Sequence, residues 1–587
     1  MNMKAGLRYI TTIGLTAALL CLAGNMTAQI IAGSFILYNG YNEKYSVMTD
    51  RNIYIAGEKL HFTVINISDR EIQQAGWSGV YYIELINSDG TLVTAAKFQL
   101  LSGRAEGTIG IPDNISTGVY FLRSYTRWMR NFSPSGFAYN RIKIINPYNS
   151  AGMDNPVAGN TGVTLGQNAG DTSVVLKMPV SCRTDKAVYD NREKVVVSLE
   201  IPLFMKTAAE QYCVTVVRPG ALDTNNPGTV RLDDATWNEF HALQYIPETE
   251  GFSLSGTILN KNGTETAKNA FVQLSMLHED SEYLSYFTGD DGKFYFSLTP
   301  FTGQQDLFIS ARVASDDPLE IRIDKDFANH NGVMVTGDLI LSDEEKSLAV
   351  EMMIHSQIIK AFAEKAASAD SLPKPDSTSL SFYGTPLRTV YIDDFIALPT
   401  LGEVFFELVP EVNIVKRKDI PHLVMTGLPR SNADLASYNP LILLDRVPVS
   451  NLKDLLEVSP NKIQRIELIN NLYVKGDIIY GGVVSIFSKK GDLGGINLPV
   501  NSSFIVFSGY YPQPAEEHEE YIEPHTDKRI PDYRNCLYWN PQVFIRPGGN
   551  ASLEFYTSDS KGDYEVIIRG LTLQGEVMEK RSRFTVR

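Results

Sequence analysis

A twelve-residue motif that occurs twice is the feature that most constrains how this chain folds. Thr-Asp-Arg-Asn-Ile-Tyr-Ile-Ala-Gly-Glu-Lys-Leu at residues 49–60 aligns without a gap with Thr-Asp-Lys-Ala-Val-Tyr-Asp-Asn-Arg-Glu-Lys-Val at residues 184–195. A repeated segment usually marks a repeated structural unit. We therefore expect two similar domains in tandem rather than one large domain. Arg192 stands where the first copy has Gly57, so we expect the turn of the second copy to differ.

The residues around the first copy have the periodicity of β-strands. Apolar and polar side chains alternate in residues 80–85, 92–98 and 119–125, and Asn-Ser-Asp-Gly at residues 87–90 is typical of a hairpin turn. Short strands at regular spacing without long helical patterns predict a β-sandwich. Residues 147–172 are rich in Asn, Gly and Thr and are expected to form a linker.

Two further β units and one helix follow. Strand patterns recur in residues 250–335 and again in the last part of the chain, near residues 536–570. Between them, an apolar stripe at helical spacing begins after Ser342, which can cap a helix together with Glu345. A chain of 587 residues is too long for one hydrophobic core, so several domains are expected.

Residues 385–495 change to a mixed pattern of helices and strands. A helix is expected from Leu401 to Val409, before Pro410. Apolar runs at residues 440–449 and 463–469 predict strands.

Two of the β units resemble known families. The motif at residues 49–60 resembles the start of the macroglobulin-type sandwich of alpha-2-macroglobulins, and the copy at residues 184–195 matches it in part. Residues 250–335 resemble the carboxypeptidase regulatory-like domain, a small sandwich without a peptidase zinc site.

The mixed segment resembles the plug domain of TonB-dependent outer-membrane receptors. Asp445 stands at the aspartate position of that family, although Arg446 follows where a glycine is usual. Ile463, Ile466 and Glu467 match the middle strand, and residues 480–490 match the family's hairpin. A receptor barrel would take several hundred residues after the plug, so we expect a plug-like domain without its own pore.

The N-terminus has the pattern of a secretory signal peptide. Lys4 and Arg8 precede an apolar run, and Met26-Thr27-Ala28 is a small-residue cleavage site. No later apolar run is long enough to span a membrane as a helix. With the plug resemblance, the leader predicts an exported protein of Bacteroidota, in the periplasm or associated with the outer membrane, with the cell surface as a further location.

Two sequence features concern covalent chemistry. Cys182 and Cys213 are candidates for a disulfide, with two buried thiols as the equal alternative. Ser371 and Ser377 lie in sequences that resemble the Bacteroidota O-glycosylation sequon, with plain linker serines as the alternative.

Nothing in the sequence indicates catalysis. The Cys-Gly-Glu-Gln thioester of covalent protease traps does not occur, nor does a Gly-x-Ser-x-Gly, His-Glu-x-x-His or phosphate-binding loop motif. We therefore predict no catalytic residue, no cofactor and no metal site. A net charge of −15 makes nucleic acid a poor partner.

The preferred hypothesis is a non-enzymatic envelope protein that binds or assembles with an outer-membrane or envelope protein, or with a glycan or peptide ligand. The plug-like domain would be the interaction module, and Arg446, Tyr480, Gly481 and Gly482 are its expected exposed loop positions. The alternative is a macroglobulin-type protease inhibitor or surface-defence protein without a thioester.

The predicted fold class is mainly β and multidomain, with tandem Ig-like or macroglobulin-like β-sandwiches and one α/β plug-like domain. The predicted boundaries are 1–28 signal peptide, 35–146 macroglobulin-like sandwich, 147–172 linker, 173–247 second partial macroglobulin-like sandwich, 248–335 carboxypeptidase regulatory-like sandwich, 342–366 helix, 367–379 Ser/Pro linker, 380–495 plug-like domain and 500–587 C-terminal Ig-like sandwich.

Overall fold

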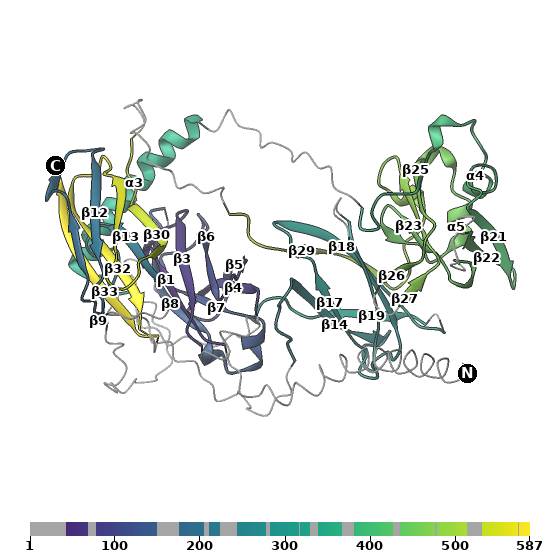
Figure 1. The fold of residues 1–587 in the computed structure, drawn as a ribbon, viewed down its shortest axis with the longest axis horizontal. Coiled ribbons are helices and arrows are strands. Elements are labelled where there is room, and N and C mark those ends of the chain that lie inside the picture. Colours follow the sequence, from purple (N-terminus) through teal and green to yellow (C-terminus); the bar gives the residue numbers. More distant parts are fainter. Residues whose placement is uncertain are drawn as a thin grey trace, which may run out of the picture. The chain divides into compact units, whose positions relative to one another are not determined.

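The computed structural model of the protein is built mainly of β-strands (Figure 1). It describes residues 43–68, 78–148, 175–204, 211–223, 244–277, 282–315, 317–328, 339–366, 381–426, 435–475, 478–513, 531–572 and 575–587. The chain forms two compact units. Unit 1 contains the chain up to residue 249 together with residues 330–368 and 513–587, and unit 2 contains residues 250–329 and 369–512. The predicted signal peptide lies outside the described residues, as do almost all residues of the two predicted linkers.

The first sandwich of unit 1 has a three-stranded and a five-stranded sheet, with strand orders β1-β3-β6 and β2-β8-β7-β4-β5. Its strands are β1 (Tyr45–Thr49), β2 (Ile53–Ile55), β3 (Lys59–Asn66), β4 (Val80–Asn87), β5 (Leu92–Gln99), β6 (Arg104–Gly110), β7 (Gly118–Tyr125) and β8 (Ala138–Ile145). The predicted hairpin joins β4 and β5, with Gly90 at φ 83°. Strands β1 to β8, within residues 45–145, thus form one sandwich.

The second sandwich is also complete, but its strands come from two distant parts of the chain. They are β9 (Leu176–Lys177), β10 (Ser181–Thr184), β11 (Val188–Tyr189), β12 (Lys194–Glu200), β13 (Gln211–Val217), β30 (Cys536–Phe544), β31 (Asn550–Tyr556), β32 (Gly562–Leu571) and β33 (Val577–Val586). The sheets have the orders β10-β12-β31 and β11-β33-β32-β13-β30, and β9 adds to β33. In Figure 1 the teal strand β13 lies beside the yellow strands β30 and β32, to which it is hydrogen-bonded.

The two sandwiches correspond strand for strand. Strand orders β1-β3-β6 and β10-β12-β31 match, and so do β2-β8-β7-β4-β5 and β11-β33-β32-β13-β30, including the parallel pairing of β2 with β8 and of β11 with β33. The short turn that joins β4 and β5 in the first sandwich is replaced, between β13 and β30, by residues 218–535. Those residues are therefore a long insertion in one hairpin of a repeated fold.

This topology corrects two predicted boundaries. The partial sandwich at residues 173–247 and the separate C-terminal sandwich at residues 500–587 are wrong, because the strands of both segments share one hydrophobic core. Val197, Leu199 and Val214 from the first segment pack there with Phe555 and Val566 from the second. Alternation along a strand indicates which face is buried, but it does not identify the partner strand.

Helix α3 (Asp343–Ala366) packs against residues of both sandwiches of unit 1. The predicted cap is present: the Glu345 N–H donates to Ser342 Oγ at 3.1 Å, and the Ser342 N–H donates to Glu345 Oε2 at 2.8 Å. Leu348 and Met352 are buried against apolar residues of both sandwiches, including Ile53 of β2 and Ile567 of β32. The helix therefore closes the junction between the sandwiches.

The third sandwich, in unit 2, has the sheets β17-β14-β19 and β16-β15-β18-β29. Its strands are β14 (Phe252–Asn260), β15 (Phe271–Met276), β16 (Tyr283–Phe287), β17 (Lys293–Leu298), β18 (Gln304–Arg312), β19 (Leu319–Ile323) and β29 (Ser502–Ser508). A sandwich was predicted for residues 248–335. Its last strand, however, is β29, which lies in the segment assigned by sequence to the C-terminal sandwich.

Residues 381–499 form the predicted α/β domain of unit 2. A five-stranded mixed sheet has the order β20-β25-β28-β23-β24, and two hairpins are separate from it. The elements are β20 (Arg388–Tyr391), α4 (Leu401–Leu408), β21 (Val412–Arg417), β22 (Ile420–Met425), β23 (Leu441–Leu444), β24 (Val447–Pro448), α5 (Leu452–Leu456), β25 (Ile463–Ile469), β26 (Tyr473–Lys475), β27 (Ile478–Tyr480) and β28 (Val483–Ser488). The hairpin implied for residues 480–490 does not form, because β27 pairs with β26 and β28 pairs with β23 and β25.

Candidate functional site

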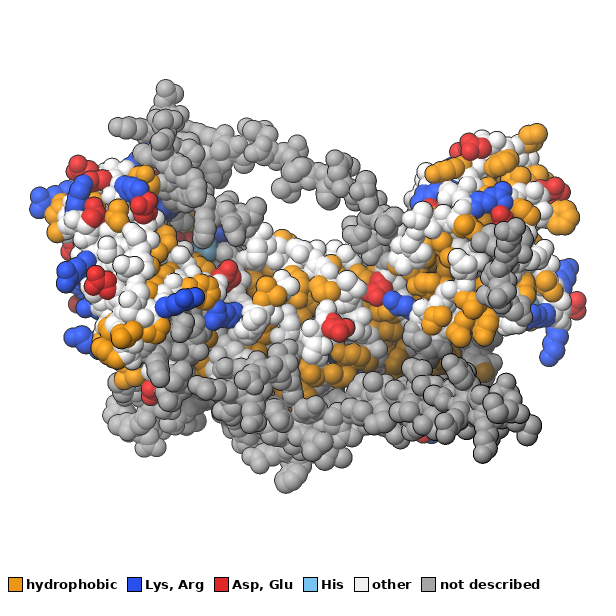
Figure 2. Space-filling view, in the orientation of Figure 1, with side chains coloured by type: hydrophobic (Ala, Val, Ile, Leu, Met, Phe, Trp, Pro, Cys, Tyr) orange, Lys and Arg blue, Asp and Glu red, His pale blue; other side chains and the backbone are white. Residues whose placement is uncertain are grey.

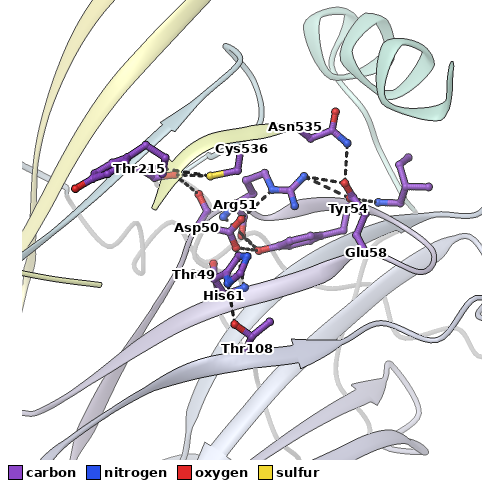
Figure 3. Close-up of polar contacts among 12 residues, drawn as sticks. Thr49, Asp50, Arg51, Tyr54, Glu58, His61, Thr108, Thr215, Asn535 and Cys536 are labelled. Carbon is purple, nitrogen blue, oxygen red and sulfur yellow. Dashed lines mark hydrogen bonds and ion pairs between the residues drawn. The ribbon is translucent and has the colours of Figure 1, made fainter. Parts of the chain in front are cut away.

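The first copy of the repeated motif forms a buried ionic network at the junction of the two sandwiches of unit 1 (Figure 3). Asp50 Oδ1 accepts hydrogen bonds from the Tyr54 hydroxyl at 2.6 Å and from the His61 N–H at 3.0 Å. Arg51 Nε donates to Asp50 Oδ2 at 3.0 Å, and Arg51 Nη1 lies 3.3 Å from Glu58. Glu58 Oε2 in turn accepts from the Ile55 N–H at 2.7 Å.

The second copy repeats the hydrogen bonds of the aspartate to the tyrosine and the backbone, and the ion pair between the basic residue and the glutamate. Asp185 Oδ1 accepts from the Tyr189 hydroxyl at 2.7 Å and from the Val196 N–H at 2.8 Å. Lys186 forms an ion pair with Glu193, as Arg51 does with Glu58. The predicted repeat is therefore confirmed at the level of individual hydrogen bonds.

The turn of the second copy, which was expected to differ, has the same handedness as the first. Arg192 has φ 56° and Gly57 has φ 89°, so both residues adopt the left-handed conformation. That conformation is unfavourable for a residue with a Cβ. The Arg192 guanidinium forms a bidentate hydrogen bond with the Asp559 carboxylate, which helps to hold Arg192 in this conformation.

The two copies differ in their surroundings. Asp50 is fully buried, and two residues of the second sandwich's chain contact the first copy. Thr215 Oγ1 of β13 donates to the Asp50 carbonyl at 3.1 Å, and Nδ2 of Asn535, which directly precedes β30, donates to Glu58 Oε1 at 2.6 Å (Figure 3). Lys186 and Glu193 of the second copy lie at the surface instead. The first network therefore connects the two sandwiches, whereas the hydrogen bonds described for the second copy lie within its own sandwich.

The electrostatics of the first network are those of a structural ion cluster. Burial alone raises the pKa of the Asp50 carboxyl, but Arg51, His61 and the Tyr54 hydroxyl outweigh burial, so this pKa lies below its ordinary value. Burial lowers the pKa of His61, whose ring Nδ1 lies 2.8 Å from Thr108 Oγ1. Every group has a protein partner, and this arrangement favours a fixed junction over chemistry on a substrate.

The three described cysteines are free thiols. Cys182 faces the core of the second sandwich, whereas Cys213 lies on the opposite sheet with its sulfur 3.7 Å from Met48 Sδ of the first sandwich. The disulfide is therefore wrong and the alternative of two buried thiols is correct. Burial raises the pKa of Cys182 to about 11 and that of Cys536 to about 11.

Asp445 and Arg446, singled out by the plug resemblance, form the turn between β23 and β24. Both have positive φ, 48° and 68°, which is the conformation of a two-residue type I′ turn. The Asp445 carboxylate accepts from the Ser488 N–H and hydroxyl at 2.7 and 2.6 Å and from the Leu493 N–H at 2.8 Å. It therefore holds the turn to the end of β28. Arg446 is half-buried, with Nη1 3.4 Å from the Leu277 carbonyl of the third sandwich.

Tyr480, Gly481 and Gly482, expected as exposed loop positions, are buried. The Tyr480 hydroxyl lies 2.9 Å from the hydroxyl of Tyr283 in the third sandwich. A Cβ on Gly481 would lie 2.4 Å from two backbone carbonyl oxygens, so the chain approaches too closely there for any other residue. These glycines serve packing, and this prediction of an interaction loop is wrong.

The exposed surface of the α/β domain carries large apolar side chains that sequence reasoning did not single out. Ile396 is 91% exposed and Phe406 on α4 is 80% exposed. Ile414, Val415 and Ile420 on the β21–β22 hairpin are exposed as well, and Figure 2 shows hydrophobic side chains on this domain's surface. Phe406 is the position that helical periodicity could have identified, because Leu401, Val404 and Phe405 fill the buried face of α4.

Ser371 and Ser377 lie outside the described residues. His355 on α3 is buried and stacks on Tyr533, with its ring Nδ1 3.3 Å from Asn535 Oδ1. Among the described residues no group of three His, Cys, Asp or Glu side chains could hold a metal ion, and none of the described helices is long and apolar enough to cross a membrane.

Comparisons with known proteins give structural neighbours only. No family model matches the sequence, and no curated protein matches it. Trypsin-activated alpha-2-macroglobulin from Escherichia coli aligns at 11% identity over 93% of this chain and 42% of that one, with a TM-score of 0.22. Salmonella alpha-2-macroglobulin reacted with methylamine aligns at 9% identity over 93% of this chain and 40% of that one, with a TM-score of 0.21. Dimeric latent PorU from Porphyromonas gingivalis aligns at 6% identity over 48% of this chain and 34% of that one, with a TM-score of 0.16. The chain spans less than half the length of these two macroglobulins, and likenesses this low carry no argument about function.

Proposed function

We propose that this protein is a non-enzymatic protein of the bacterial cell envelope, associated with the outer membrane, whose α/β domain binds a protein partner. Support for export comes from the leader-like residues 1–28, and support for the outer membrane from the resemblance of residues 380–495 to receptor plug domains. The sandwiches of unit 1 serve as the scaffold, and unit 2 lies within the segment inserted between β13 and β30.

One observation supports the binding role most: the apolar surface of the α/β domain. Soluble domains rarely leave several large apolar side chains exposed on neighbouring elements unless they bind something there. Phe406 lies on α4, which packs against β21, and β21 carries the exposed Ile414 and Val415. Burying a side chain such as Phe406 or Ile396 against a partner contributes about 1.5–3 kcal/mol.

The β21–β22 hairpin offers a second means of binding. Within the described residues each of its strands pairs only with the other, so both outer edges have backbone groups without a strand partner. Such an edge can add a strand from another chain. Lys416, Arg417 and Lys418 near the turn make this hairpin tip basic in a chain of net charge −15. A partner with an extended, acidic segment fits this combination.

The proposal is tested by affinity capture from the envelope fraction with surface variants of the full chain. Ile396→Ser and Phe406→Ser remove apolar area from the α/β domain, whereas Leu101→Ser removes an exposed apolar side chain of the first sandwich and is the matched control. We expect the wild type and the control to retain one defined partner and the double variant I396S/F406S to lose it. Capture of the same partner at the same yield by all three proteins would contradict the proposal.

The alternative of a macroglobulin-type protease inhibitor rests on the motif at residues 49–60 and its copy. It requires that a protease cut a bait segment and remain bound afterwards. Incubation of the full chain with trypsin followed by size-exclusion chromatography separates the two functions. Our proposal expects free protease after cleavage, and a stable complex of protease with the cleaved chain would favour the alternative.

A further inference from the structure

A cleft in unit 2, between the third sandwich and the α/β domain, has the dimensions of a ligand site. Its volume is about 710 Å³, within the range of roughly 300–1,000 Å³ typical of small-molecule pockets. One wall is the outer face of the sheet β16-β15-β18, and the other consists of residues 437–442, 448–450 and 478–480 of the α/β domain. This cleft is separate from the exposed side chains on α4 and β21.

The strand register shows which side chains of the sheet face the cleft in the first wall. Phe271 of β15 lies directly opposite both Phe287 of β16 and Arg312 of β18, so these three side chains share one face. The Arg312 guanidinium lies 5.0 Å from the centre of the Phe271 ring. Gln273, two residues after Phe271, points to the same face. The opposite face, with Val272 buried in the sandwich, is apolar.

One arginine, Arg312, provides the positive charge of the cleft. Arg312 is the only ionisable side chain of the Asp, Glu, Lys, Arg and His types among the residues that line the cleft, and no described carboxylate pairs with it. In a chain of net charge −15, an arginine in a cleft without an ion-pair partner among the described residues attracts anions. A guanidinium binds a carboxylate through two parallel hydrogen bonds.

The other lining groups fit hydroxyl-rich ligands. Asn269, Gln273 and Asn439 carry amides, which both donate and accept hydrogen bonds, as sugar hydroxyls do. Phe287 is 54% exposed and Tyr438 is 40% exposed, so each side of the cleft presents an open aromatic surface. One cation, several amides and two aromatic rings match a saccharide that carries a single carboxylate.

A buried hydrogen-bond chain starts at Gln273, one of the residues that line the cleft. Gln273 Nε2 donates to the Tyr283 hydroxyl at 2.7 Å, and that hydroxyl lies 2.9 Å from the Tyr480 hydroxyl of the α/β domain. Tyr283 is fully buried. The chain therefore joins both walls and holds Gln273 in place before any ligand binds, which lowers the entropic cost of binding.

We propose that this cleft binds an acidic saccharide, with Arg312 pairing with its carboxylate. The binding site goes beyond the proposed protein-binding role of the same unit and does not depend on it. A peptide with a free C-terminal carboxylate is the competing ligand class, and the experiment includes it as a separate arm.

The test is isothermal titration calorimetry on the full chain with a panel of di- and trisaccharides that each contain one galacturonate, glucuronate or sialic-acid residue and no other acidic group. Methyl esters of the same sugars remove the charge, and acetylated tripeptides with a free carboxylate represent the peptide arm. Arg312→Gln removes the cation from the cleft. Arg322→Gln removes an arginine of the same sandwich that pairs with Glu320 outside the cleft and is the matched control.

We expect saturable binding of at least one acidic saccharide, at least about tenfold weaker binding of its ester and of that saccharide to R312Q, and unchanged binding to R322Q. Equal melting temperatures of the two variants show that R312Q remains folded. Absence of binding across the saccharide panel, equal binding to R312Q and wild type, or binding of the peptides alone would each overturn the inference. Loss of the envelope partner in I396S/F406S with intact saccharide binding would separate the two proposals.

Discussion

Asp50 and Asp185 hold the same position in two copies of one motif, but one is buried and the other is not. Each carboxylate accepts hydrogen bonds from a tyrosine hydroxyl and a backbone N–H. Only Asp50 also bonds a buried arginine, at 3.0 Å. The two aspartates therefore share two hydrogen bonds and differ in burial and in the arginine partner, so comparing them measures what the buried ion pair adds.

Removing the charge of the buried copy should destabilise unit 1 far more than removing that of the exposed copy. Asp50→Asn leaves Arg51 in a buried site with only Glu58 as its partner, and such a loss costs about 3 kcal/mol. Asp185→Asn should cost at most about 1 kcal/mol. Calorimetric unfolding of the full chain, with the unit 1 transition assigned from the wild type, measures both changes. Equal losses in the two variants would show that the first network does not depend on burial.

Glu43 should make the first sandwich lose stability as the pH rises. Burial raises the pKa of its carboxyl, against the hydrogen bonds from Thr126 and Ser78 that lower it. A carboxyl with a raised folded-state pKa contributes stability below its unfolded pKa of about 4.3, and that contribution is lost as the pH rises through the folded pKa. The melting temperature of the Glu43→Gln variant, relative to that of the wild type, should therefore rise between pH 4 and pH 8. A difference that does not change with pH would contradict this cause.

Cys182 and Cys213 should resist alkylation because they are buried, and not because they form a disulfide. Burial raises the pKa values of Cys182 and Cys213, so little thiolate exists at pH 8. We expect iodoacetamide to leave both unmodified in the folded protein and to modify both after unfolding without reductant. Mass spectrometry of the peptides measures this. Two unmodified cysteines in the unfolded, unreduced chain would indicate a disulfide.

At the scale of elements, the β23–β24 turn depends on one carboxylate. The backbone of both turn residues is left-handed, and Asp445 connects the turn to Ser488 and Leu493. Asp419 in the β21–β22 turn is also left-handed, at φ 64°, but it is exposed. The two positions therefore share the backbone cost of a Cβ and differ in the hydrogen bonds of the side chain.

Asp445→Ala should loosen the end of β28, and Asp419→Ala should not. Removing the Asp445 carboxylate leaves the Ser488 and Leu493 N–H groups without their acceptor, at about 1–3 kcal/mol of local stability. Hydrogen exchange followed by mass spectrometry should show faster exchange of the peptide that contains these amides in D445A alone. Similar acceleration there in D419A would contradict the assignment.

The elements themselves were largely predictable from the sequence, and their partners were not. The helix predicted from Leu401 to Val409 is α4, Leu401–Leu408, because capping and periodicity are local signals. The pairing of β13 with β30 was missed, because strand pairing across an insertion leaves no local signal. The candidate site was also predictable only where the signal is local. The repeat identified the ionic motif, but the burial of Tyr480 depends on the third sandwich, which is distant in sequence.

At the scale of the whole molecule, one repeated fold carries an insertion larger than itself. Loop-closure entropy grows only slowly with length, so a hairpin can accept a long insertion if its ends are held. The ends are held here: β13 and β30 pair directly, and Asn535 and α3 contact the first sandwich. The scaffold can therefore remain folded while unit 2 carries the binding surface.

The central claim, that the α/β domain is the binding module, is tested most directly by site-specific photocrosslinking in cells. A photoreactive phenylalanine analogue is placed at Phe406, which is 80% exposed on the α/β domain, or at Leu101, which is 62% exposed on the first sandwich. The account predicts a discrete crosslinked adduct of one mass from position 406 and none from position 101. An adduct from position 101 with none from position 406 would contradict it.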